Sequence, residues 1–181
     1  EIGPFGMFTD LYPGGDESAG TTDRYNDMGL DASYQFMGDG SNIYTLNARY
    51  TYESQNLAAS AFFGDADHAH NHLSDLRLDG SYYWENEIGG SVGVFDTTGT
   101  ADAELYGDDR TLTPDSSGFL FQIDATPFTN NPSPLGARFA MRVGLQYFVY
   151  TRFNGALTNY DGLGHNASDN NTLRIFTWFA L

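Results

Sequence analysis

The chain has no cysteine and no lysine, and its eight basic residues are all arginine. Without cysteine there are no disulfides, no thiolate metal ligands and no attachment point for a c-type haem, so we expect no covalently bound cofactor. No run approaches the roughly 20 apolar residues of a membrane-spanning helix, and residues 57–64 come nearest. The formal net charge of -16 repels polyanions and argues against a nucleic-acid partner.

What the chain does have is aromatic residues and glycine. Its 12 Tyr, 14 Phe and 21 Gly are typical of strands and turns rather than helices. Between residues 136 and 152, Phe139, Met141 and Val143 alternate with polar positions that include Arg138 and Arg142. A two-residue period predicts a β-strand with one apolar face and one charged face.

The same alternation predicts eight strands, of which the first is the weakest because Pro4 cannot donate to a sheet ladder. Their predicted ranges are 2–10, 28–36, 43–53, 72–84, 87–95, 118–126, 136–152 and 171–181. The connections alternate between short turns and segments of roughly 18 to 22 residues. The long ones are 10–27, 54–71, 96–117 and 152–170.

This alternation of loop lengths predicts an all-β fold, an antiparallel up-and-down transmembrane β-barrel of about eight strands with short periplasmic turns and long outer loops. Residues 1–181 then form a single domain of the bacterial outer membrane, or a fragment of a larger barrel. Aromatic residues near strand ends, such as Tyr50, Tyr82 and Trp84, suit interfacial girdles. Alternation alone does not tell inside from outside, however. The alternative is a soluble β-barrel or sandwich that binds a ligand or a glycan.

Charged residues on the polar faces are the candidate functional residues, and in a barrel they line the lumen. The predicted lumen-lining set is Arg49, Arg77, Asp79, Asp124, Arg138, Arg142 and Arg174. In a closed eight-stranded barrel these side chains would fill the interior as a paired network. In a larger barrel they would line a water-filled pore and set its ion preference.

Two features of the predicted outer loops suggest metal binding. Acidic residues crowd residues 10–27 and 96–115, where carboxylates offer a divalent cation oxygen ligands, although no loop has the spacing of a dedicated calcium loop. His68, His70 and His72 recur at every second position, which on a strand places three imidazoles on one face, a spacing that zinc or copper sites use. A barrel-embedded hydrolase has no convincing nucleophile and base in this sequence.

The last third of the chain carries several short polar motifs. They are residues 114–118 (PDSSG), 153–155 (FNG), 159–162 (NYDG) and 166–173 (NASDNNTL). These motifs resemble the C-terminal part of bacterial outer-membrane proteins in which a haem-binding segment precedes a porin-like barrel. The resemblance implies a barrel in the outer membrane and a role beside electron transfer. Because the Cys-x-x-Cys-His motif is missing, haem would come only through a partner cytochrome or a segment upstream of Glu1.

Together these patterns predict a non-enzymatic, porin-like barrel of a Gram-negative outer membrane. It would act in transport as a pore, or as an insulating sheath around a partner such as an electron-transfer cytochrome or another barrel chain. Outer-membrane lipid would surround it.

Overall fold

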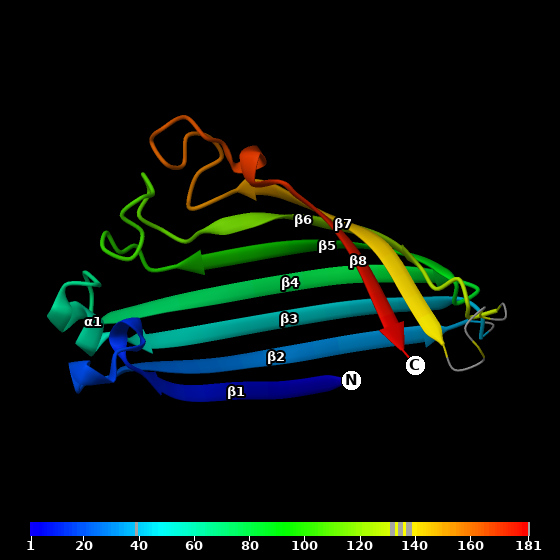
Figure 1. The fold of residues 1–181 in the computed structure, drawn as a ribbon, viewed down its shortest axis with the longest axis horizontal. Coiled ribbons are helices and arrows are strands. Elements are labelled where there is room, and N and C mark those ends of the chain that lie inside the picture. Colours follow the sequence, from blue (N-terminus) through cyan, green and yellow to red (C-terminus); the bar gives the residue numbers. More distant parts are fainter. Residues whose placement is uncertain (39, 131–132, 134–135, 137–138, 181) are drawn as a thin grey trace.

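Eight antiparallel strands form one sheet in the computed structural model, which describes residues 1–38, 40–130, 133, 136 and 139–180. The strands are β1 (Ile2–Leu11), β2 (Asp23–Met37), β3 (Ile43–Asn56), β4 (His70–Trp84), β5 (Ile88–Gly99), β6 (Ser116–Ala125), β7 (Ala140–Arg152) and β8 (Thr172–Ala180). Each pairs with its neighbours in chain order (Figure 1). The predicted all-β, up-and-down fold is confirmed.

The sheet is open, so the predicted closure into a barrel is wrong for this structure. Strand order runs from β1 to β8, and the two outermost strands pair only with β2 and β7. The sheet twists strongly, so that β7 and β8 run at a steep angle to β1 in Figure 1. One edge of β1 and one edge of β8 therefore carry backbone groups without a partner strand in the described part of the chain. Pro4 is tolerated because β1 is an edge strand.

The connections divide between the two ends of the sheet as predicted. At one end β4 and β5 are joined by Glu85, Asn86 and Glu87, and the φ angles of 50° and 56° at Glu85 and Asn86 are those of a tight hairpin turn. At the other end lie the long connections, with the 3-10 helices η1 (Pro13–Gly15), η2 (Glu17–Ala19) and η3 (Ala167–Asn170) and the helix α1 (Ala58–Phe63) (Figure 1). We call these long connections the loop end.

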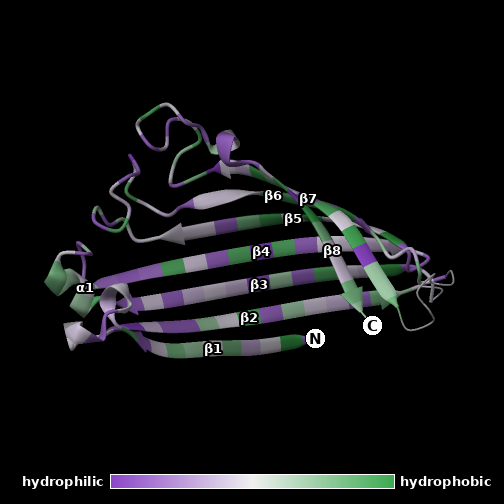
Figure 2. Cartoon of the chain, in the orientation of Figure 1, coloured by the Kyte–Doolittle hydropathy of each residue, from purple (hydrophilic) through white to green (hydrophobic). Residues whose placement is uncertain are grey.

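Side chains on a strand alternate between its two faces. Hydrophobic and hydrophilic residues follow one another along the strands in Figure 2. We call the face that carries Leu46, Leu78 and Val92 the apolar face, and the face that carries Arg49, Asp79 and Asp124 the polar face. None of the described residues covers the apolar face, where Leu46 is 62% and Val92 59% exposed. The buried apolar residues in the described part of the chain are instead at the loop end, namely Leu57, Ala59, Ala66 and Ala167.

Aromatic rings lie over glycines at four places on the polar face. Each glycine pairs in register with the aromatic residue of a neighbouring strand, and a Cβ there would come within 3 Å of the ring. The pairs are Phe5 with Gly29, Tyr83 with Gly89, Phe95 with Gly118 and Phe176 with Gly144. The glycines leave room for large rings to lie flat against the sheet, which protects the exposed backbone and fixes the register.

No helix among the described residues is long and apolar enough to span a membrane.

Candidate functional site

The polar face carries six of the seven predicted lumen-lining residues. By register, Arg49, Arg77, Asp79, Asp124, Arg142 and Arg174 all lie on it, spread over β3, β4, β6, β7 and β8. Arg138, the seventh, lies outside the described residues. Sequence alternation therefore grouped these side chains on one face correctly, although it gave no partners for them.

A polar network centred on Asp124 ties together four strands of this face. Arg142 Nε and Nη2 donate to the two carboxylate oxygens of Asp124, both at 2.9 Å, and the Tyr83 hydroxyl donates to them at 3.0 Å. Gln122 Nε2 adds a bond of 2.7 Å. The Arg142 guanidinium also lies over the Phe176 ring at 5.8 Å. With Asp124 only 3% exposed, this bidentate pair is held rigidly between β4 and β8.

Charged groups on β2, β3 and β4 are paired less deeply. Arg49 reaches Asp31 through Nε at 2.6 Å and Nη2 at 3.2 Å. Arg77 donates from Nε to Asp75 at 2.8 Å, and its side chain remains 65% exposed. Because both pairs are open to solvent, they fix side-chain positions more than they stabilise the fold.

A chain of hydrogen bonds crosses β2, β3 and β4 on the polar face and ends at the Asp79 carboxylate. Asn47 donates to Asp79 at 2.8 Å and accepts from the Ser33 hydroxyl at 2.9 Å. Arg174 lies on exposed β8, in register with Gln146 of β7. The polar face is therefore an array of charged and hydrogen-bonding side chains, with no nucleophile and base brought together on it among the described residues.

The apolar face ends abruptly towards the loop end. On β4 it carries Trp84, Tyr82, Leu78 and Leu76 and then changes to Ser74, His72 and His70. The same change occurs on β2 beyond Met28 and on β3 beyond Tyr52. Near the short turns the face is aromatic, with the Tyr44 and Tyr82 rings 4.8 Å apart and Phe36 beside Tyr44 at 6.2 Å. The face is thus a band of apolar side chains with tyrosines towards both margins.

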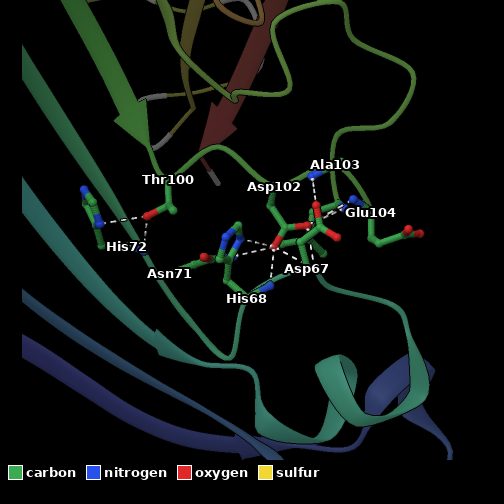
Figure 3. A network of polar contacts seen from close by, with 9 residues as sticks. Asp67, His68, Asn71, His72, Thr100, Asp102, Ala103 and Glu104 are labelled. Carbon is green, nitrogen blue, oxygen red and sulfur yellow. Dashed lines mark hydrogen bonds and ion pairs between the residues drawn. The ribbon is translucent and has the colours of Figure 1, made fainter.

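Asp102 is the hydrogen-bonding centre of the loop end, as Figure 3 shows. Its carboxylate is 1% exposed and accepts from five donors, namely the backbone N–H groups of Asp67, His68, Glu104 and Leu105 and the side-chain amide of Asn71. The Ala103 N–H returns a bond to Asp67 at 2.9 Å. Burial opposes ionisation of Asp102, but the N–H donors of Asp67 and Leu105 outweigh it and hold its pKa well below the ordinary range.

Three further sets of hydrogen bonds lie at the loop end. Asp23, 2% exposed, accepts from the backbone N–H groups of Ala59 and Ser60 at 2.9 and 3.1 Å and so caps α1. Arg110 Nε donates to the Asn159 carbonyl at 2.9 Å, and Asp109 accepts from Asn154 at 2.8 Å. The connections between β3 and β4, between β5 and β6, and between β7 and β8 are therefore bonded to one another, and we call them the collar.

The three histidines do not form one ligand set. His68 Nδ1 lies 3.7 Å from Asp102, whereas His72 Nδ1 bonds to Thr100 Oγ1 at 2.8 Å (Figure 3). The His72 ring also stacks on Tyr52. His70 begins β4. Among the residues that the structure describes, no three His, Cys, Asp or Glu side chains are grouped to hold a metal ion. The predicted zinc or copper site gains no support from this geometry.

The predicted divalent-cation site at the acidic loops also gains no support from the geometry. Several of the carboxylates there already accept hydrogen bonds from the chain, as Asp16 does from Ser18 and Asp67 does from Ala103. Asp23 and Asp102 do the same in buried positions. Much of the acidic character of these loops thus serves to satisfy backbone N–H groups.

Asp161 and His165 form an ion pair in the connection between β7 and β8. Asp161 Oδ2 lies 2.5 Å from His165 Nδ1, and Asp161 Oδ1 accepts from the Leu163 N–H at 2.9 Å. The imidazole beside Asp161 lowers the pKa of that carboxyl to about 2, and Asp161 in turn raises the pKa of His165 above 6.5. The pair is fully formed only where both groups are charged.

The stability that this pair gives to the connection is expected to depend on pH in two windows. Because the folded pKa of His165 is raised, its contribution is present below pH 6.5 and is lost as the pH rises through the higher folded value. Because the pKa of Asp161 is lowered, its contribution is present above pH 3.8 and is lost as the pH falls towards about 2. An NMR titration of the His165 ring should give a midpoint above 6.5, and Asp161→Asn should lower it. An unchanged midpoint in Asp161→Asn would contradict the pairing.

Sequence reasoning missed the buried carboxylates and a line of aromatic contacts. Asp23 and Asp102 look like any other acid of the loops, and no spacing in the sequence marks them. The aromatic line runs from Phe148 through Phe95, Tyr150 and Phe153 to Tyr160. The sequence did contain an indication of this line, because Phe95, Phe148 and Tyr150 occupy positions on the otherwise polar faces of their strands.

Comparison of the chain with protein-family models, with curated protein sequences and with solved structures gave no match.

Proposed function

We propose that this chain is a non-enzymatic wall segment of a porin-like β-barrel in a bacterial outer membrane. The apolar face would contact lipid, the polar face would line a water-filled pore, and the collar at the loop end would form the outer mouth. The proposal rests on the contacts described above and on the alternation of apolar and polar residues along the strands.

The observation that carries the proposal is the exposed apolar band. Soluble monomers rarely expose apolar patches of more than a few hundred Å². Here the band crosses the strands from β2 to β8 and includes Met28, Leu46, Val92, Ile123 and Ile175, each more than half exposed. A surface of this kind needs a lipid or protein covering.

The height of the band fits a bilayer. Ten residues along β4 separate Trp84, at the short-turn margin, from Ser74, where the face turns polar. Ten residues of strand span about 33 Å, and a tilt of 35–45° reduces this to about 25 Å across the membrane, the usual height of the apolar band in outer-membrane barrels.

The open edges favour a wide pore over a packed eight-stranded interior. The backbone groups along the free edges of β1 and β8 cannot remain unpaired in hydrocarbon, so further strands must complete the wall. β1 and β8 run antiparallel, so an even number of added strands, as in a second copy of this eight-stranded sheet, keeps the up-and-down order. A barrel with more than eight strands has room for water between its walls.

The charges of the polar face predict a preference for cations. Strand positions on this face carry Asp27, Asp31, Glu53, Asp75, Asp79 and Asp124 against Arg49, Arg77, Arg142 and Arg174. Acidic side chains therefore outnumber basic ones along the proposed pore. Fixed negative charge raises the local concentration of cations and lowers that of anions.

Planar-bilayer conductance tests this function. The protein should give discrete current steps with a cation preference, and Arg174→Glu should increase the cation-to-anion permeability ratio about twofold by adding negative charge to the polar face. The control is Arg24→Glu, because Arg24 lies on the opposite face beyond the apolar band and should leave the ratio unchanged.

The outcomes separate the candidate roles. Bilayers that stay silent would contradict the pore and would favour the insulating sheath around a partner cytochrome that the sequence also predicts. Recovery of the protein in the aqueous fraction without detergent would contradict the membrane wall and would favour a soluble ligand-binding sheet.

A further inference from the structure

A line of aromatic rings runs along the polar face from the collar towards its middle. Successive ring centroids from Tyr160 to Phe153, Tyr150, Phe95 and Phe148 are 4.9, 5.2, 5.4 and 6.4 Å apart. Contact between β5 and β7 is possible because Gly118 of β6, which lies between them, has no side chain. The rings meet nearly edge to face, with interplanar angles of 66–84°.

The inner end of this line borders a cavity of about 240 Å³. Phe95, Leu120, Phe148 and Tyr150 supply its apolar wall. Arg77 and Asp79 on β4 supply a polar wall on the same face. An apolar surface with a few placed polar groups is the usual composition of a small-molecule site.

The polar wall is held in position by its own contacts. Asp75 accepts from Arg77 Nε and from the Thr97 hydroxyl, both at 2.8 Å, and Asp79 accepts from Asn47 at 2.8 Å. The planar guanidinium and carboxylate groups are therefore fixed beside the aromatic wall, with most of the Arg77 side chain exposed. The guanidinium can donate to one hydroxyl of a ligand and the carboxylate can accept from an adjacent one.

We propose that this cavity is a binding subsite for one ring of a neutral carbohydrate. The C–H groups on the face of a sugar ring carry partial positive charge and suit the negative face of an aromatic ring, while its hydroxyls suit Arg77 and Asp79. A net charge of -16 disfavours an anionic solute. The exposed Arg77 at the rim disfavours a quaternary ammonium ion. The inference rests on the proposed function, because the pore would bring the sugar to the cavity.

Equilibrium binding of a neutral oligosaccharide to the full chain in detergent micelles tests the subsite. With maltotriose as the probe in isothermal titration, we expect saturable binding to the unaltered protein. Phe148→Leu keeps an apolar side chain but removes the ring, and should weaken binding about tenfold, or about 1.4 kcal/mol. Phe148→Tyr restores the ring and should retain most of the affinity. Phe121→Leu, on the apolar face, is the matched control and should bind as the unaltered protein does.

Several results would overturn the subsite. They are no saturable binding to the unaltered protein, equal losses in Phe148→Leu and Phe121→Leu, loss of binding in Phe148→Tyr while its thermal unfolding is unchanged, and tighter binding of tetramethylammonium than of maltotriose. Because the titration does not involve conductance, the two proposals fail separately. Current steps without sugar binding would refute only the subsite, whereas sugar binding with silent bilayers would refute only the pore.

Discussion

Replacing Asp102 with alanine is expected to loosen the collar and to lower the free energy of unfolding by about 3 kcal/mol. Five donors converge on this carboxylate, which is 1% exposed. Without it these N–H groups lose their acceptor, and the connection between β3 and β4 separates from the connection between β5 and β6. Chemical unfolding in detergent and the rate of protease cleavage in residues 100–115 measure the effect.

Asp108→Ala is the matched control for this prediction. Asp108 lies in the same connection but is exposed, so its loss should change stability by less than about 0.5 kcal/mol. Asp102→Asn should fall between the two, because an amide keeps one acceptor oxygen and loses the charge. Equal stability of Asp102→Ala and Asp108→Ala would contradict the role given to the buried carboxylate.

Arginine introduced at Val92 is expected to destabilise the protein in a bilayer by about 2–4 kcal/mol. Val92 lies midway along the apolar band and is 59% exposed, so the new charge would face hydrocarbon. The neighbouring Ser91 points to the polar face, where Gln122 is its cross-strand partner. Ser91→Arg should therefore cost less than about 1 kcal/mol, because its charge stays in water.

Unfolding in lipid vesicles of the two arginine variants gives the comparison. The substitutions add the same side chain to adjacent positions of one strand, so strand propensity and size are matched. A larger loss in Ser91→Arg than in Val92→Arg would place the polar face against lipid and reverse the assignment of the two faces.

The strands of the sheet were predictable because a two-residue period extends along each of them. All eight predicted strands exist, but their ends differ, as in β2, which begins at Asp23 rather than at residue 28. Its extra residues continue the ladder with Asn26 and Arg24, polar on the otherwise apolar face. An apolar pattern cannot locate a strand end where both faces become polar.

Closure was predicted wrongly for a physical reason. Alternation records which face each residue takes, but it does not record how many strands close a wall or which edges meet. Among the residues that the structure describes, β1 pairs only with β2 and its other edge has no partner strand. Pro4 is the one residue of Ile2–Leu11 that indicates this edge position.

The candidate site was predictable in its face and not in its contacts. Alternation placed Arg142 and Asp124 on one face, whereas their bidentate bond and the Tyr83 hydroxyl depend on the register across three strand pairs. The role of Asp102 could not be predicted from the sequence, since its hydrogen-bond donors come from residues 67–71 as well as from its own turn. The local sequence does not show how distant segments of the chain pair.

Single cysteines at adjacent positions test the central claim most directly, and the absence of native cysteine makes the labelling unambiguous. Spin labels at Val92→Cys and Ser91→Cys, in protein reconstituted into lipid vesicles, report contact with oxygen dissolved in hydrocarbon and with a water-soluble nickel complex. If the apolar band faces lipid, the label at position 92 will be accessible to oxygen and not to the nickel complex. The label at position 91 will be accessible to the nickel complex. Nickel access at both positions would contradict a lipid-facing apolar band.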